Sequence, residues 1–259
     1  MTTRPAAPVG SPCWVDLWTS DVPGSRAFYG ELFGWEAQEP SPEFGGYFMF
    51  TRHGVPVAGG MGDMGDMTAD NRWKIYLATD DATKTVEAAR GAGAEVVVPP
   101  VAVADLGVQA VVLDPAGAPI GTWQPGAFPG FTVLNEHGAP SWFELHSADF
   151  ARSLDFYRSV FGLQPTVVAD SDDFRYATVR DAGGRDDVAG IADAAATLAD
   201  PTAGTWVLYW EVDDADAAAD RVGQLGGSVV TGAEDTPYGR IAGVTDPAGA
   251  PFRLRQSPR

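Results

Sequence analysis

The chain is poor in several features that would point to particular compartments or folds. Cys13 is the only cysteine among 259 residues, so no disulfide can form within the chain and an oxidising compartment is not needed. No stretch approaches ~18 consecutive apolar residues, and no N-terminal segment joins positive charge to a long apolar run. We therefore expect a cytoplasmic protein with no membrane span.

Basic residues are also scarce. Lys and Arg together number 17 against 35 Asp and Glu, which gives a formal net charge of −18, and only Lys74 and Lys84 are lysines. A surface this acidic repels the phosphate backbone of nucleic acids. The composition therefore excludes nucleic acid as an expected partner.

The sequence does contain a tandem repeat. Four residues of the first half recur in the second half at a constant offset of 128, since 142 − 14, 149 − 21, 157 − 29 and 162 − 34 all give this value. The pairs are Trp14 and Trp142, Asp21 and Asp149, Tyr29 and Tyr157, and Gly34 and Gly162. A chain of this length accommodates two ordinary domains, and the repeat predicts that it has two.

Each repeat predicts a strand followed by a helix. Residues 142–147 alternate between apolar and polar, which is typical of a half-buried strand. Asp149 stands at the N-cap of a helix over 150–161, which Gly162 ends. Strand–helix pairs are also predicted at 14–33, at 73–92 and at 207–225, and Asp-Pro-Ala-Gly turns occur at 114–117 and 246–249.

Each half therefore reads as two βαβββ modules. The fold class that this predicts is α+β, with four modules forming two tandem domains of cupped mixed sheets half covered by helices. We expect the first domain at 12–124, a linker rich in Pro and Gly at 125–140, and the second domain at 141–257. Residues 1–11 are expected to be a loose arm.

These motifs resemble those of the vicinal oxygen chelate superfamily. They are Asp21 with Phe28-Tyr29 and Phe33-Gly34, Asp149 with Phe156-Tyr157 and Phe161-Gly162, and the two Asp-Pro-Ala-Gly turns. The resemblance covers nearly all of 12–257 and implies glyoxalase-like, bleomycin-resistance-like or dioxygenase-like domains. It also implies a small-molecule ligand in a cup formed by each pair of modules.

Many members of that superfamily bind a metal ion in the cup. The resemblance places the ligand positions at residues that do not suit a cation, which needs imidazole, thiolate or carboxylate donors. These residues are Trp14, Lys74, Gly121, Trp142, Trp206 or Val207, and Arg253. We therefore expect no metal site at the family positions and no cofactor.

Alternation along the strands predicts which side chains face each cup. The first cup is expected to present Trp14, Asp16, Trp18, Lys74, Tyr76 and Trp123 to a ligand. The second is expected to present Trp142, Glu144, His146, Tyr209, Glu211, Arg253 and Arg255. Indole and phenol rings suit a flat aromatic guest, and the carboxylates and guanidinium groups would orient it.

Three functional hypotheses follow from these cups. The first is a binding protein that holds a hydrophobic or aromatic small molecule without a metal. The second is an enzyme of the lyase, dioxygenase or hydroxylase kind, with His146 and Glu144 as its catalytic pair. The third is an interaction protein whose tryptophans simply fill the cups. A metal held by His146, Glu144 and Glu211 remains a further alternative, and the chain could be a monomer or a homodimer.

Overall fold

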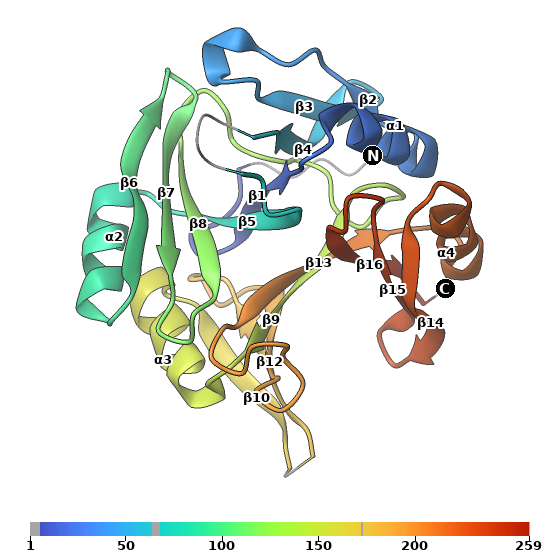
Figure 1. The fold of residues 1–259 in the computed structure, drawn as a ribbon. Helices are drawn as coiled ribbons and strands as arrows, with labels where there is room; N and C mark the ends of the chain where they lie inside the picture. The colour runs from blue at the N-terminus through green and yellow to red at the C-terminus, as the bar shows by residue number, and fades with distance from the viewer. Residues whose placement is uncertain (1–5, 64–67, 172, 259) are drawn as a thin grey trace.

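The chain forms two domains, each built around one eight-stranded sheet (Figure 1). The computed structural model describes residues 6–63, 68–171 and 173–258. Both sheets are mixed, and each combines two βαβββ modules, so the predicted α+β architecture of four modules is confirmed.

The elements of the first domain follow the predicted order. They are β1 (Pro12–Trp18), α1 (Val22–Phe33), β2 (Glu36–Ala37), a 3-10 turn (Pro42–Phe44), β3 (Phe48–Arg52), β4 (Val55–Met61), β5 (Arg72–Ala78), α2 (Ala82–Gly91), β6 (Glu95–Val103), β7 (Gly107–Leu113) and β8 (Pro119–Pro125). Those of the second are β9 (Pro140–Ser147), α3 (Phe150–Phe161), β10 (Gln164–Asp170), β11 (Arg175–Arg180), β12 (Asp187–Asp193), β13 (Thr205–Glu211), α4 (Ala215–Gln224), β14 (Ser228–Thr236), β15 (Gly239–Thr245) and β16 (Pro251–Gln256).

The two sheets have the same topology. The strand order is β2-β3-β4-β1-β5-β8-β7-β6 in the first and β10-β11-β12-β9-β13-β16-β15-β14 in the second. The first strands of two modules pair antiparallel at the centre, as β1 with β5 and β9 with β13, and each pairs on its other side with a parallel strand. The residues on one face of these central strands therefore converge from both modules.

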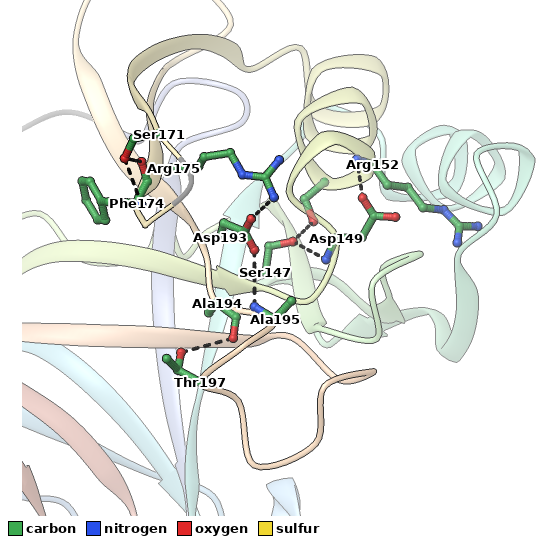
Figure 2. Close-up of polar contacts among 11 residues, drawn as sticks. Ser147, Asp149, Arg152, Ser171, Phe174, Arg175, Asp193, Ala194, Ala195 and Thr197 are labelled. Carbon is green, nitrogen blue, oxygen red and sulfur yellow. Dashed lines mark hydrogen bonds and ion pairs between the residues drawn. The ribbon is translucent and has the colours of Figure 1, made fainter.

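Each of the α-helices α1 to α4 begins at an aspartate N-cap. Asp21, Asp81, Asp149 and Asp214 each accept a hydrogen bond from the backbone N–H three residues on. Figure 2 shows this at α3, where the Ser147 hydroxyl also accepts from the Asp149 N–H. Replacing such a cap by alanine removes about 1 kcal/mol, so these residues fix where strand gives way to helix.

The edge strands β6 and β14 are each nine residues long. β6 continues through Pro99 and Pro100, where the register with β7 shifts between Val98 and Val101. Proline lacks an N–H but is tolerated at an edge or a bulge, where no ladder bond is lost. The prolines therefore do not end the strand as they would in the middle of a sheet.

The two domains are joined by bonds that cross from each to the other. The Tyr29 hydroxyl of α1 donates to Asp246 Oδ2 of the second domain at 3.1 Å. The Tyr157 hydroxyl of α3 donates to Asp114 Oδ2 of the first domain at 3.0 Å. In Figure 1, α1 accordingly lies beside α4, and α2 beside α3. The tyrosine of each repeated helix motif thus bonds to the Asp-Pro-Ala-Gly turn of the other domain.

An aromatic cluster fills one side of this interface. The Trp210 ring, on β13, lies 4.8 Å from the Trp35 ring, 5.2 Å from the Trp73 ring and 5.8 Å from the Phe33 ring, between ring centroids. Trp210 is fully buried, with 0% of its surface exposed. The second domain therefore packs its largest fully buried side chain against the core of the first.

The N-terminal arm is more ordered than the sequence predicted. Residues 1–5 lie outside the described part of the chain, but the Gly10 N–H donates to the Ala78 carbonyl and the Ala182 N–H donates to the Val9 carbonyl. Ser11 is fully buried. The expectation of a loose arm is therefore wrong from about residue 8 onward, because both domains hold this segment by backbone hydrogen bonds.

No helix among the described residues is long and apolar enough to span a bilayer.

Candidate functional site

The cup of the second domain contains an open cavity of about 910 Å³. Strands β9, β11, β13 and β16 contribute to its floor, while the N-terminal arm, the linker and the loop before β12 contribute to its walls. Its principal side chains are Trp142, Glu144, Tyr176, Thr178, Asp181, Arg185, Asp186, Asp187, Tyr209, Tyr238, Ile241 and Arg255. The cavity is therefore bounded by both domains and by the segment that connects them.

Glu144 lies at the centre of this cup and accepts three hydrogen bonds. Its Oε1 lies 2.8 Å from His146 Nε2 and 3.1 Å from the Tyr209 hydroxyl, and its Oε2 accepts from the Tyr176 hydroxyl at 2.9 Å. Burial raises the pKa of Glu144, but the hydrogen bond and charge of His146 and the two phenols outweigh it and leave this pKa below its ordinary value. Glu144 therefore holds its negative charge at neutral pH.

The other residues predicted for the second cup divide into two groups. Trp142, Tyr209 and Arg255 line the cavity as expected. His146 does not, because its ring is turned to Glu144. Arg253 and Glu211 also lie outside the lining. Arg253 donates to Thr231, and Glu211 accepts from the Ser257 N–H at 2.9 Å. The structure therefore does not bring Glu211 together with His146 and Glu144.

The first cup repeats the same polar cluster but buries it. Asp16 Oδ1 accepts from Trp14 Nε1 at 2.9 Å and from the Tyr47 hydroxyl at 2.8 Å, and Tyr76 is a further donor. Here burial is the larger effect, so the pKa of Asp16 is raised although its partners and Lys74 act to lower it. The pKa values of Asp16 and Glu144, the central carboxylates of the two cups, are thus shifted in opposite directions.

The linker closes the first cup. The Phe128 ring packs edge-on against the Trp14 ring at 4.8 Å, and the Phe128 carbonyl accepts from Trp123 Nε1 at 2.9 Å. Lys74 places its ammonium group 3.4 Å from the centroid of the Trp18 ring. The six residues predicted to bind a ligand in this cup contact one another or the linker, and none of them lines the cavity of the second domain.

Sequence reasoning missed one tyrosine in each cup. Tyr47 and Tyr176 donate to the central carboxylates Asp16 and Glu144 from outside the strands that were used to predict the cups. They occupy matching places in the repeat, at an offset of 129 (176 − 47). Extending the alignment of the two halves beyond the first helix would have found them.

A glycine makes room for each of these tyrosines. A Cβ atom on Gly190 would lie 1.9 Å from the Tyr176 hydroxyl oxygen, and one on Gly59 would lie 1.9 Å from that of Tyr47. These separations are far below a van der Waals contact. The glycines are therefore needed for the tyrosine hydroxyls to reach the carboxylates.

Replacing Gly190 by alanine is expected to lower the free energy of unfolding by about 1–3 kcal/mol, because the displaced Tyr176 hydroxyl leaves Glu144 without one of its donors. Urea unfolding followed by circular dichroism measures this. Gly232→Ala is the control, since nothing lies within 4 Å of a Cβ at that exposed position. Equal unfolding midpoints for the two variants would show that the tyrosine hydroxyl does not depend on this glycine.

The residues of the cups do not fit a divalent metal. The positions where the superfamily resemblance places metal ligands are occupied by indole, ammonium, guanidinium or apolar groups, which cannot donate to a cation. Both Glu144 oxygens already accept hydrogen bonds. Within 6–63, 68–171 and 173–258, no three side chains of His, Cys, Asp or Glu gather as a metal would require.

Comparisons with known protein families match both halves of the chain. Residues 140–254 match the family described as the glyoxalase/bleomycin resistance protein/dioxygenase superfamily. Residues 14–121 match the family described as a glyoxalase-like domain. The two matched segments correspond to the two sheets.

Individual relatives are similar over almost the full chain. The anthracycline biosynthesis protein DnrV of Streptomyces peucetius is 35% identical, over 95% of this chain and 92% of its own. The protein named "Putative glyoxylase CFP32" of Mycobacterium bovis is 34% identical, over 95% and 94%. Among solved structures, the Mn(II)-bound glyoxalase from Novosphingobium aromaticivorans has a TM-score of 0.67 at 18% identity, covering 96% of this chain and 82% of that one.

Proposed function

We propose, for a chain that belongs to the glyoxalase/bleomycin resistance protein/dioxygenase superfamily, that its second cup binds a flat aromatic small molecule without a metal ion. The observation that carries this proposal is the contrast between the two cups. The first is filled by its own side chains and by Phe128, whereas the second leaves about 910 Å³ open over the equivalent cluster. Small-molecule sites have volumes of roughly 300–1,000 Å³.

The aromatic walls of the cavity support a planar ligand. Trp142, Tyr176, Tyr209 and Tyr238 line it, and the Trp142 side chain is half-buried. Aromatic rings offer large apolar faces at a low cost in side-chain entropy, and their hydroxyl and N–H groups orient polar substituents. A fused ring system would therefore bury more of these walls than a small aliphatic metabolite.

The charge of the lining favours a ligand that carries an amino group. Four acidic side chains line the cavity against two basic ones: Glu144, Asp181, Asp186 and Asp187 against Arg185 and Arg255. Arg185 is moreover within 3.9 Å of Asp181. A cation is attracted to the acidic excess, while an anion would meet mostly repulsion.

The name of one relative suggests a chemical class for the ligand. DnrV is named as an anthracycline biosynthesis protein, and it is 35% identical to this chain. Anthracyclines join a fused aromatic ring system to an amino sugar, which matches the aromatic walls and the acidic lining. We therefore take an anthracycline-type aromatic polyketide as the ligand class to test first.

Titration with the anthracycline daunorubicin is expected to quench tryptophan fluorescence and raise the melting temperature, because a ligand that binds only the folded state stabilises it. Trp142→Ala is expected to weaken binding about 10- to 30-fold by removing one wall of the cup. The matched variant Trp14→Phe, in the closed cup, is expected to keep the affinity. Adding a chelator is expected to change nothing. Equal affinities for the wild-type protein and Trp142→Ala would overturn the assignment of this cup.

One contact favours a second candidate, an enzyme that uses Glu144 and His146 as a base. The two side chains lie 2.8 Å apart, and Glu144 borders the cavity. The lowered pKa of Glu144 weighs against this role, because a carboxylate held by three donors is a weak base. Incubation with the same anthracycline, followed by mass spectrometry, separates the candidates, since turnover that His146→Gln abolishes would favour the enzyme.

A further inference from the structure

Phe128 covers Trp14 in the first cup, whereas the equivalent Trp142 of the second cup lines the cavity. We infer that Phe128 occupies the place of the ligand's aromatic ring and its adjoining oxygen, so that the ligand of the second cup sets a ring edge-on against Trp142 and an oxygen acceptor against Arg255. The inference rests on the proposed function and assigns the pose and the polar group that the cup selects. Three comparisons between the cups support it.

The first comparison concerns the polar groups that hold each tryptophan. In the first, Trp14 Nε1 donates to the Tyr47 hydroxyl at 2.8 Å, and this hydroxyl donates to Asp16. In the second, Trp142 Nε1 donates to the Tyr176 hydroxyl at 3.3 Å, and that hydroxyl donates to Glu144 at 2.9 Å. Each tryptophan N–H is therefore held by the equivalent tyrosine, and Trp14 Nε1 donates in addition to Asp16 Oδ1 at 2.9 Å.

The second comparison concerns what covers each tryptophan. Phe128 meets Trp14 at an interplanar angle of 89°, and only 4% of Trp14 is exposed. In the part of the chain that the structure describes, no ring packs on Trp142, which stays half-buried at the wall of the cavity. Edge-to-face packing at this separation is a favoured geometry between aromatic rings. The uncovered Trp142 is therefore the place where a ligand ring completes the equivalent pair.

The third comparison concerns the polar donor beside the ring. Trp123 pairs in register with Ala78, and Arg255 with Glu211, the equivalent place in the second sheet. Trp123 donates to the Phe128 carbonyl. Arg255 donates from Nε to the Tyr238 carbonyl at 2.9 Å and from Nη1 to the Ser141 carbonyl at 3.4 Å, and a guanidinium carries five N–H donors in all. The geometry therefore selects an aryl ketone, quinone or phenol oxygen at this point.

The first test uses 4-fluoroacetophenone, which combines a ring with an adjoining carbonyl, observed by fluorine NMR. Wild-type protein is expected to show one bound resonance, from the second cup. Phe128→Ala is expected to show two, because the vacated first cup admits the probe. The double variant Phe128→Ala with Trp142→Ala is expected to retain only the new resonance. A single resonance in a folded Phe128→Ala variant would overturn the inference and leave the proposed function standing, whereas none in the wild-type protein would count against the proposed function itself.

The second test leaves the first cup and its fold untouched. Arg255→Met is expected to weaken binding of 4-fluoroacetophenone by about tenfold but to leave that of 4-fluorotoluene, which has no carbonyl, within about twofold. Arg185→Met, at the same cavity, is the control and is expected to treat both probes alike. An equal effect of Arg255→Met on the two probes would overturn the assignment of the oxygen acceptor.

Discussion

Replacing Trp210 with alanine is expected to lower the free energy of unfolding by about 3–5 kcal/mol. The Trp210 ring is fully buried and packs against the rings of Trp35, Trp73 and Phe33 across the domain interface. Its Nε1 has no hydrogen-bond partner among the described residues, so the loss comes from packing and not from a broken bond. The cavity left between the domains cannot close without moving both sheets.

Differential scanning calorimetry and urea unfolding measure this effect. In a protein of this size a loss of 3–5 kcal/mol lowers the melting temperature by roughly 6–20 °C, and weaker coupling is expected to split the transition in two. Val230→Ala is the control, because Val230 is 67% exposed on the edge strand β14 and its truncation leaves no cavity. A single transition within about 2 °C of the wild-type value would contradict the view that this cluster joins the domains.

The double variant Tyr29→Phe with Tyr157→Phe is expected to lower the free energy of unfolding by about 4–12 kcal/mol. Each substitution removes a buried hydroxyl that donates to an aspartate of the other domain and accepts from a tryptophan, Trp73 or Trp206. Each therefore leaves a carboxylate oxygen and an indole N–H without a partner, at about 1–3 kcal/mol for each unpaired group. The two sites share no partner, so the losses are expected to add.

The loss in this double variant is expected to grow as the pH rises from about 4 to 7. Burial raises the pKa of Asp114 and of Asp246 above the ordinary value, and the tyrosine hydroxyls act to lower it. Removing the hydroxyls raises the folded-state pKa further. A carboxyl group with a raised folded-state pKa stabilises the fold below its unfolded-state pKa, and this stabilisation disappears as the pH rises through the folded-state pKa. The variant, in which this pKa is higher, therefore loses more of its free energy of unfolding near neutral pH than at pH 4.

Urea unfolding at both pH values tests this double variant, with Tyr238→Phe as control because Tyr238 is 60% exposed. An equal loss of unfolding free energy at pH 4 and pH 7 would mean that the tyrosine hydroxyls do not change the pKa values of the aspartates. A loss of no more than about 1 kcal/mol at pH 7 would mean that the crossed bonds do not hold the domains together.

The local structure could be predicted from the sequence because its signals are local. The helix over 150–161 begins and ends where Asp149 and Gly162 predicted, since a cap acts within one turn of its own residue. The four modules followed from the repeat for the same reason. Strand alternation also placed Trp142, Tyr209 and Arg255 correctly on the cavity wall.

The state of each cup could not be predicted in this way. Trp14 and Trp142 occupy equivalent positions, and only the path of the linker decides that Phe128 covers the first and leaves the second open. Tyr47, just before β3, and Tyr176, on β11, reach their carboxylates from segments outside the predicted cup. Tyr29 and Tyr157 belong to the repeated helix motifs, and no local pattern indicates that their hydroxyls bond across the domain interface. Contacts between distant segments have no period in the sequence.

The crossed tyrosine–aspartate bonds also set when the chain can finish folding during its synthesis. The first half leaves the ribosome with Tyr29 and the aromatic rings around Trp35 uncovered, since Asp246 and Trp210, which cover them, follow 217 and 175 residues later (246 − 29 and 210 − 35). N-terminal domains fold first as the chain is made, and exposed apolar surface on such intermediates promotes aggregation. The nascent chain therefore exposes this apolar face until β13 and the turn after β15 have been made.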